Sequence, residues 1–199
     1  MSTPLILASA SPRRRELLTL LGVEHSCQAA AIDETPLNAE VPETYVSRMA
    51  QEKAQAVAQH AAGRAGAVLG ADTTVVIDED ILGKPLDHLD ALSMLARLSG
   101  REHRVVTGLC LVRDGVLYSD VVISQVEFVS LDRATCEAYL ATDEPWDKAG
   151  AYGIQGLGGA FVRAVRGSYS NVVGLPLAET RQLLVAQGIA TALDRDPVR

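Results

Sequence analysis

The eleven residues from Ala67 to Ile77 constrain the fold more than any other segment of the chain. They read AVLGADTTVVI, apolar at both ends with one carboxylate, Asp72, in the middle. A continuous apolar run of this length is typical of a strand covered on both faces, as in a sheet flanked by helices. Burying the Asp72 carboxylate in such a strand is costly, so it is paired, caps a backbone group or has a function.

Helical and strand patterns alternate along the rest of the chain. Helices are predicted at residues 12–21, 43–61, 89–98, 132–141 and 176–187. Strands are predicted at residues 4–8, 25–29, 67–77, 103–112, 116–129 and 161–165. Asp114-Gly115 between two long β-rich segments predicts a hairpin, which favours a mixed sheet over a purely parallel one. With no repeat or linker, residues 1–199 are predicted to form one domain of the α/β or α+β class, a twisted mixed sheet flanked by helices.

Composition excludes several classes of function. The net charge is -7 and the pI is about 5.1, whereas a nucleic-acid-binding protein normally presents a basic surface. The first residues lack a cationic signal region, and no stretch approaches the roughly 20 apolar residues of a membrane span, so we expect a soluble, cytoplasmic protein with no membrane partner. The cysteines, Cys27, Cys110 and Cys136, are far apart and are predicted to be reduced structural thiols.

The segment SASPRRR, residues 9–15, predicts an anion site at a strand-to-helix junction. Three arginines in the opening turn of a helix oppose its dipole, and a bound anion would reverse that cost. The Ser9 hydroxyl, the free helix N–H groups and the Arg13 and Arg14 guanidinium groups suit phosphate. The alternative is a solvated basic helix start, and Arg15 is assigned to solvent.

Four charged residues elsewhere suggest a site for a phosphate and a cation. Lys84, between Gly and Pro, is a partner for Asp72 or a second phosphate contact. Lys53 falls on the apolar stripe of its helix, so it must either extend to solvent or meet an anion. Glu34 is the natural second carboxylate for a hard divalent cation such as Mg²⁺ or Mn²⁺, although an exposed loop acid would look the same.

The segment from Gly150 to Gly167 contains six glycines, which let the backbone approach a ligand closely. Within it, Gln155 carries an amide that can both donate to and accept from the edge of a base. Gly-rich segments are also often plain loops, so this pattern alone leaves both interpretations open. The familiar alternatives are absent from the sequence: there is no GxxxxGK[ST] phosphate loop, no GxSxG elbow and no HExxH zinc motif.

Four motifs together resemble one family. The segments SASPRRRELL, GADTTVVIDEDILGKP, DKAGAYGIQG and GSYSNVVGLPL resemble, in order and spacing, those of the Maf family of nucleotide pyrophosphatases. The resemblance runs from Leu5 to about Leu184. It implies two lobes with a cleft between them, similar to the triphosphatases that remove unwanted nucleotides from the cell.

The resemblance also implies roles for single residues. Asp72 occupies the position of the proton acceptor for the attacking water, and Glu34 that of a motif acid. Positions that contact substrate in the family are, in this sequence, Ser9, Arg13, Arg14, Lys53 and Lys84. The positions that set specificity are Arg13, Thr73 and Gln155.

The stretch AGAYGIQG with Gln155 is similar to the branch of the family that acts on dTTP and UTP. The expected reaction is therefore hydrolysis of a pyrimidine triphosphate, modified forms included, to the monophosphate and pyrophosphate, with Asp72 as base or, with Glu34, as ligand of a divalent cation. A nucleotide-binding regulator of cell division and a nucleotidyl transferase are the competing hypotheses. The apolar content and the resemblance favour a homodimer.

Overall fold

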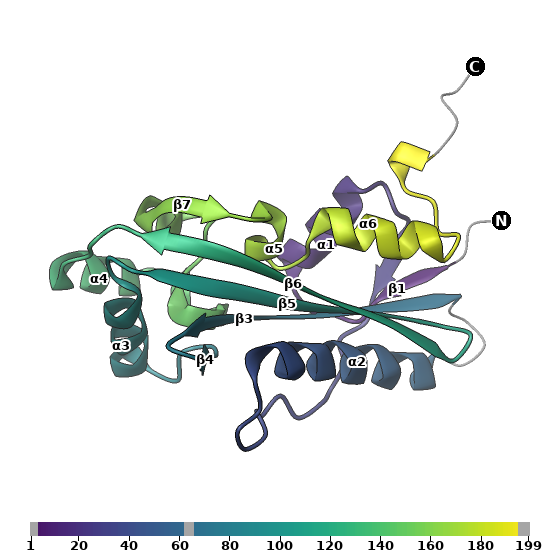
Figure 1. The fold of residues 1–199 in the computed structure, drawn as a ribbon, viewed down its shortest axis with the longest axis horizontal. Coiled ribbons are helices and arrows are strands. Elements are labelled where there is room, and N and C mark those ends of the chain that lie inside the picture. Colours follow the sequence, from purple (N-terminus) through teal and green to yellow (C-terminus); the bar gives the residue numbers. More distant parts are fainter. Residues whose placement is uncertain (1–3, 62–65, 195–199) are drawn as a thin grey trace. The chain divides into compact units, whose positions relative to one another are not determined.

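The computed structural model describes residues 4–61 and 66–194. Within these residues seven strands form one sheet in the order β2-β1-β3-β5-β6-β7, with β4 paired to β3 (Figure 1). β1 runs parallel to β2 and β3, whereas β4 is antiparallel to β3 and β7 is antiparallel to β6. The sheet is mixed, as predicted. The strands are β1 (Leu5–Leu7), β2 (His25–Cys27), β3 (Ala67–Ile77), β4 (Asp80–Leu82), β5 (Glu102–Arg113), β6 (Val116–Phe128) and β7 (Val162–Arg166).

The helices also follow the sequence pattern. The α-helices are α1 (Pro12–Leu20), α2 (Pro42–His60), α3 (His88–Leu98), α4 (Arg133–Leu140), α5 (Tyr169–Val173) and α6 (Leu177–Ala186). Short 3₁₀ helices lie at Pro145–Asp147, Ala149–Ala151, Leu157–Phe161 and Ala192–Asp194. Among the described residues, no helix has both the length and the apolar character needed to cross a bilayer.

The chain divides into two compact units. Unit 1 comprises Met1–Asp72, Thr107–Val122 and Gly174–Arg199, and unit 2 comprises Thr73–Val106 and Ile123–Val173. Strands β3, β5 and β6 therefore contribute residues to both units. The boundary within β3 falls directly after Asp72, so the predicted site residues are divided between the two units.

In unit 1, helix α2 lies directly on the backbone of the sheet (Figure 1). Its buried stripe includes Ala50, Ala54 and Val57, which pack in one cluster with residues of β1, β3 and β5. Glycine allows this close approach: a Cβ at Gly70 would lie 2.2 Å from the Ala50 carbonyl oxygen, and one at Gly108 would lie 2.3 Å from the Val46 carbonyl oxygen. The absence of a side chain at Gly70 on β3 and at Gly108 on β5 therefore sets how closely α2 approaches these two strands.

We expect Gly70→Ala to destabilise the protein. The added methyl group would also lie 2.9 Å from the Ala54 amide nitrogen, so it cannot fit unless α2 moves. Overpacking of this kind costs about 1–3 kcal/mol in the free energy of unfolding, measurable as a lower urea midpoint. The matched control is Gly83→Ala, whose Cβ would meet nothing within 4 Å. Equal midpoints for the two variants would contradict this account of the α2 packing.

Unit 2 has its own core, built around aromatic rings. The Phe128 ring centroid lies 4.7 Å from that of Tyr152 and 5.9 Å from that of Phe161, in edge-to-face arrangements. Helices α3 and α4 pack on this core through Leu95, Leu98, Tyr139 and others. His103 joins the cluster, 3% exposed, and its Nε2 lies 2.8 Å from the Tyr152 hydroxyl.

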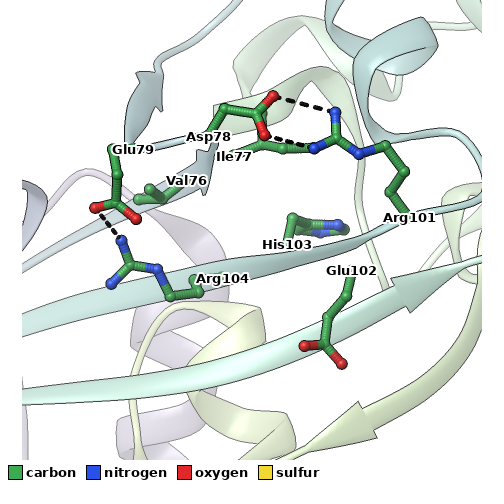
Figure 2. A pocket seen from close by; sticks show the side chains of 8 residues that line it. All are labelled: Val76, Ile77, Asp78, Glu79, Arg101, Glu102, His103 and Arg104. Atoms are coloured by element: carbon green, nitrogen blue, oxygen red, sulfur yellow. Dashed lines mark hydrogen bonds and ion pairs between the residues drawn. The ribbon is translucent and has the colours of Figure 1, made fainter.

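A small pocket of about 130 Å³ lies on unit 2 beside His103 (Figure 2). Four of the charged groups that line it are paired with one another: Asp78 accepts two hydrogen bonds from Arg101, and Glu79 accepts one from Arg104. Glu102, also in the lining, pairs with Arg166 of β7. The residues lining it are Val76, Ile77, Asp78, Glu79, Arg101, Glu102, His103 and Arg104. This lining includes none of the predicted site residues, and its ion pairs account for the charged groups without a ligand.

His103 predicts a loss of stability in mild acid. Burial lowers the pKa of His103 from 6.5 to about 4. Because the unfolded chain takes up this proton near pH 6.5 and the folded one only near pH 4, the stability contribution is present above the unfolded pKa and falls as the pH falls through this window. We expect a loss of about 1–2 kcal/mol between about pH 7 and pH 5, measured by urea unfolding. His103→Gln should remove this part of the pH dependence; an unchanged profile would contradict the assignment.

Candidate active site

Three side chains predicted to act together meet in unit 1. The Lys53 ammonium donates to Asp72 Oδ1 at 2.6 Å and forms an ion pair with Glu34 Oε1 at 2.8 Å. Lys53 is 8% exposed and Asp72 is 7% exposed, whereas the Glu34 side chain is about half exposed. The Lys53–Asp72 pair is therefore the strongly coupled one, because neither charge can be left alone at such burial.

The packing of α2 on β3 brings Lys53 to Asp72. Residues two apart on a strand point to the same face of the sheet. The Asp72 side chain therefore points toward α2, as a side chain at position 70 would. Lys53 follows Ala50 by three positions on α2 and so lies on the same stripe. Gly70, which lets α2 approach the strand, therefore lies two residues before Asp72, and Asp72 meets Lys53 of that helix.

The loop that carries Glu34 is fastened to α2. The Tyr45 hydroxyl donates to the Glu34 carbonyl oxygen at 3.0 Å. Arg48 Nη2 donates to the Thr35 carbonyl oxygen at 3.2 Å, and the same guanidinium group binds the Glu40 carboxylate at 2.6 and 2.7 Å. The pKa of Tyr45 is raised by burial and by the Asp72 and Glu34 carboxylates, so its hydroxyl stays protonated and donating. Sequence reasoning missed both Tyr45 and Arg48, because nothing local to α2 marks a contact with loop residues 11 and 13 positions earlier in the chain.

The N-terminus of α1 has the form expected of an anion site. Ser11 caps the helix by accepting from the Arg14 N–H at 3.5 Å, and Pro12 occupies the first turn. Ser9, which is 8% exposed, accepts from the Ser11 N–H at 3.1 Å. A hydroxyl that accepts one bond keeps its own proton to donate, so Ser9 can still serve an anion.

Arg14 is held in place and influenced by the carboxylates of the site. Its Nε donates to the Gly174 carbonyl oxygen at 2.8 Å. Burial lowers the pKa of Arg14, the Asp72 and Glu34 carboxylates oppose that shift, and the charge of Arg13 adds to it. Arg13 is half-buried, while Arg15 is exposed as predicted. The two carboxylates of Asp72 and Glu34, called the acidic pair below, thus interact electrostatically with the arginines at the start of α1, within unit 1.

The remaining predicted residues lie in unit 2. Thr73 is half-buried in β3, and Lys84 is exposed after β4. Gln155 is exposed in a turn closed by a bond from the Gly156 N–H to the Gly153 carbonyl oxygen at 3.4 Å. The sequence suggested Lys84 as a partner for Asp72, whereas the lysine that meets Asp72 in the structure is Lys53.

Asp72 and Glu34 are two carboxylates of the kind that can bind one divalent cation. Within residues 4–61 and 66–194, no group of three or more His, Cys, Asp or Glu side chains could hold a metal ion. Mg²⁺, however, is commonly bound through one or two carboxylates with water and substrate phosphate completing its shell. Asp72 and Glu34 both reach the Lys53 ammonium, so their oxygens converge on a position that already holds a positive charge.

Comparison with known proteins places the chain in a family. The model of the family described as Maf-like protein matches residues 4–187. This chain belongs to the Maf family. The matched range includes every residue of the acidic pair, the α1 N-terminus and the Gly-rich segment, so the whole candidate site lies inside the Maf region.

Curated Maf relatives share about half of their residues with this chain. The dTTP/UTP pyrophosphatase of Shewanella oneidensis is 52% identical over 191 residues, covering 93% of this chain and 98% of the relative. Those of Anaeromyxobacter dehalogenans and Colwellia psychrerythraea are 52% and 48% identical, covering 94% and 96% of this chain and 96% and 92% of the relatives. A solved dITP/XTP pyrophosphatase from Mycobacterium abscessus is 15% identical, covers 64% of this chain and 75% of its own, and has a TM-score of 0.41, too slight a likeness to bear on function.

Proposed function

We propose that this Maf protein hydrolyses dTTP and UTP, and modified pyrimidine triphosphates of the same kind, to the nucleoside monophosphate and pyrophosphate. The observation that carries the proposal is the Lys53 ammonium bound between Asp72 and Glu34, beside the cationic start of α1. The names of relatives about 50% identical over nearly the whole chain support the same activity.

The cationic groups suit a triphosphate. In an acidic chain they are concentrated locally: Arg13 and Arg14 open α1, and Lys53 lies within the acidic pair. Guanidinium groups bind phosphate through paired hydrogen bonds, and the Ser9 hydroxyl and the helix N–H groups add donors. We assign phosphate contacts to these four residues and to Lys84.

The acidic pair suits water activation. A water oxygen attacks the α-phosphorus, the bond from that phosphorus to the oxygen bridging to the β-phosphate breaks, and pyrophosphate leaves with the bond's electron pair. We propose that Asp72 accepts the proton of the attacking water or holds that water through a bound cation. Mg²⁺ or Mn²⁺ held by Asp72 and Glu34 would neutralise phosphate charge and polarise water.

Recognition of the nucleobase is assigned in this proposal to Thr73 and Gln155, together with Arg13. Arg13, Thr73 and Gln155 occupy the specificity positions implied by the family resemblance, and the amide of Gln155 can donate to and accept from the edge of uracil or thymine. We further propose that residues 1–199 act as one domain, as a homodimer in the cytoplasm, removing unwanted nucleotides from the pool.

One assay tests the proposed function. The protein is incubated with dTTP, UTP, CTP or GTP and with Mg²⁺ or Mn²⁺, and pyrophosphate and nucleotide products are both measured. Equal amounts of pyrophosphate and free monophosphate from dTTP and UTP are expected. Tight binding without product would favour a nucleotide-binding regulator of cell division. A nucleotidyl product other than free monophosphate would favour a transferase.

A further inference from the structure

Glu144 is the centre of a hydrogen-bond cluster in unit 2. Its Oε1 accepts from the Tyr139 hydroxyl at 2.9 Å and from the Gly158 N–H at 3.0 Å, and its Oε2 accepts from the Leu157 N–H at 2.8 Å. The Tyr139 hydroxyl in turn accepts from the Gly153 N–H at 3.2 Å. Two side chains therefore bind the backbone of the Gly-rich segment at three places.

These contacts lie on both sides of Gln155 in the sequence. The turn that presents it begins at Gly153, which is bound to Tyr139, and runs into Leu157 and Gly158, which are bound to Glu144. Gln155 itself is exposed, so its side chain is available while the backbone on both sides of it is fixed.

Two glycines of this segment leave room for the side chains of Glu144 and Tyr139. A Cβ at Gly156 would lie 2.2 Å from Glu144 Oε2, and a Cβ at Gly158 would lie 2.9 Å from the Tyr139 hydroxyl oxygen. These glycines therefore serve the contact between the turn and a carboxylate, in addition to any approach of a ligand.

Glu144 is ionised at neutral pH. Burial raises its pKa, but the hydrogen bonds from Gly158, Leu157 and Tyr139 and the charge of Lys148 outweigh burial, and the pKa lies below its usual value. An ionised carboxylate accepts at both oxygens, and hydrogen bonds to a charged acceptor are stronger than neutral ones.

We propose that Glu144 is a positioning residue for base selection, which holds the turn so that the Gln155 side chain reaches the nucleobase from one fixed place. This inference rests on the proposed function. Uracil and thymine present an acceptor at O4, where cytosine presents a donor at N4. A side-chain amide has a donor and an acceptor at similar positions, and turning it over exchanges them. A turn held in one place keeps the amide at a distance and angle that suit O4, and a loosened turn lets the side chain shift and present its donor and acceptor to cytosine instead.

The test is the ratio of kcat/KM for UTP to kcat/KM for CTP in Glu144→Gln. The amide that replaces the carboxylate has one accepting atom, so it cannot accept at both positions. We expect the ratio to fall roughly tenfold, about the effect of losing one hydrogen bond to a charged group. Because both substrates are measured on one preparation, a smaller folded fraction cancels from the ratio. Glu127→Gln, which loses an ion pair with Arg163 on β6 and β7, is the matched control and should keep the wild-type ratio.

A double-mutant cycle tests whether Glu144 acts through Gln155. In a Gln155→Ala background, Glu144→Gln should leave the ratio unchanged, because the amide that it positions is gone. If Glu144→Gln does not fold, Tyr139→Phe removes a milder part of the same support and should lower the ratio in the same direction. An unchanged ratio in the folded variant, or an equal further fall in the Gln155→Ala background, would overturn the inference while leaving the proposed function intact. A wild type that releases no pyrophosphate from any nucleotide would overturn both.

Discussion

Replacing Asp72 by asparagine is expected to lower kcat for pyrophosphate release by about 10²–10⁴, the usual contribution of a general base. The amide has nearly the shape of the carboxylate, so it fits the same buried position on β3. It can neither take a proton from water nor supply a negative charge for a cation. Release of pyrophosphate from dTTP and UTP at saturating substrate, with unfolding measured in parallel, checks the prediction.

The control for this variant is Asp114→Asn in unit 1. Asp114 lies in the hairpin turn with its side chain 89% exposed, so the same chemical change there should leave turnover within about twofold. Turnover near the wild-type value in a folded Asp72→Asn protein would remove Asp72 from the mechanism.

The second large effect is expected from Lys53→Met. Without the ammonium group, Asp72 and Glu34 face each other uncompensated, and the phosphates of the substrate lose a cation. We expect kcat/KM to fall by about 10²–10³ and the free energy of unfolding to fall by about 3 kcal/mol, because the partner charge stays buried. Steady-state kinetics with dTTP and urea unfolding measure the two effects separately.

Combining the two substitutions separates stability from catalysis. The Lys53→Met, Asp72→Asn double variant removes both buried charges, so it should recover most of the stability lost in Lys53→Met, with no recovery of activity. Arg113→Met, which removes a partly exposed charge from unit 1, should change stability by only about 0.5 kcal/mol. Additive losses of stability would mean that the Lys53–Asp72 bond contributes nothing to the fold.

The elements that sequence predicted well are those with strong local signals. The predicted strand at residues 67–77 has the bounds of β3. A long apolar run of this kind is typical of a strand that is covered on both faces of a sheet. The hairpin after β5 turns at Asp114 and Gly115, both with positive φ, as an Asp-Gly pair favours. Asp132 caps α4 by accepting from the Thr135 N–H at 2.7 Å. Helix α5, of five residues, was not predicted, because so short a helix has no amphipathic period to detect.

The candidate site was predictable where a residue type conflicted with its surroundings. Asp72 in an apolar strand and Lys53 on an apolar stripe each demanded a partner, and the structure shows that they are partners of each other. From the sequence we instead suggested Lys84 as the partner of Asp72, because the two residues lie close together in the chain. The supports Tyr45, Arg48 and Glu144 were missed since each is unremarkable among its neighbours and acts on a backbone group elsewhere.

The sequence alone determined the class of fold, the position of nearly every strand and helix, and the family, because hydrophobic period, turn residues and motif spacing are local properties. Tertiary structure decided which charges meet. The pairing of Lys53 with Asp72 follows from how closely α2 packs on Gly70, and the hold of Glu144 on the Gln155 turn follows from the room left by Gly156. Such contacts depend on distances between segments far apart in the chain, and those distances are set only when the core is packed.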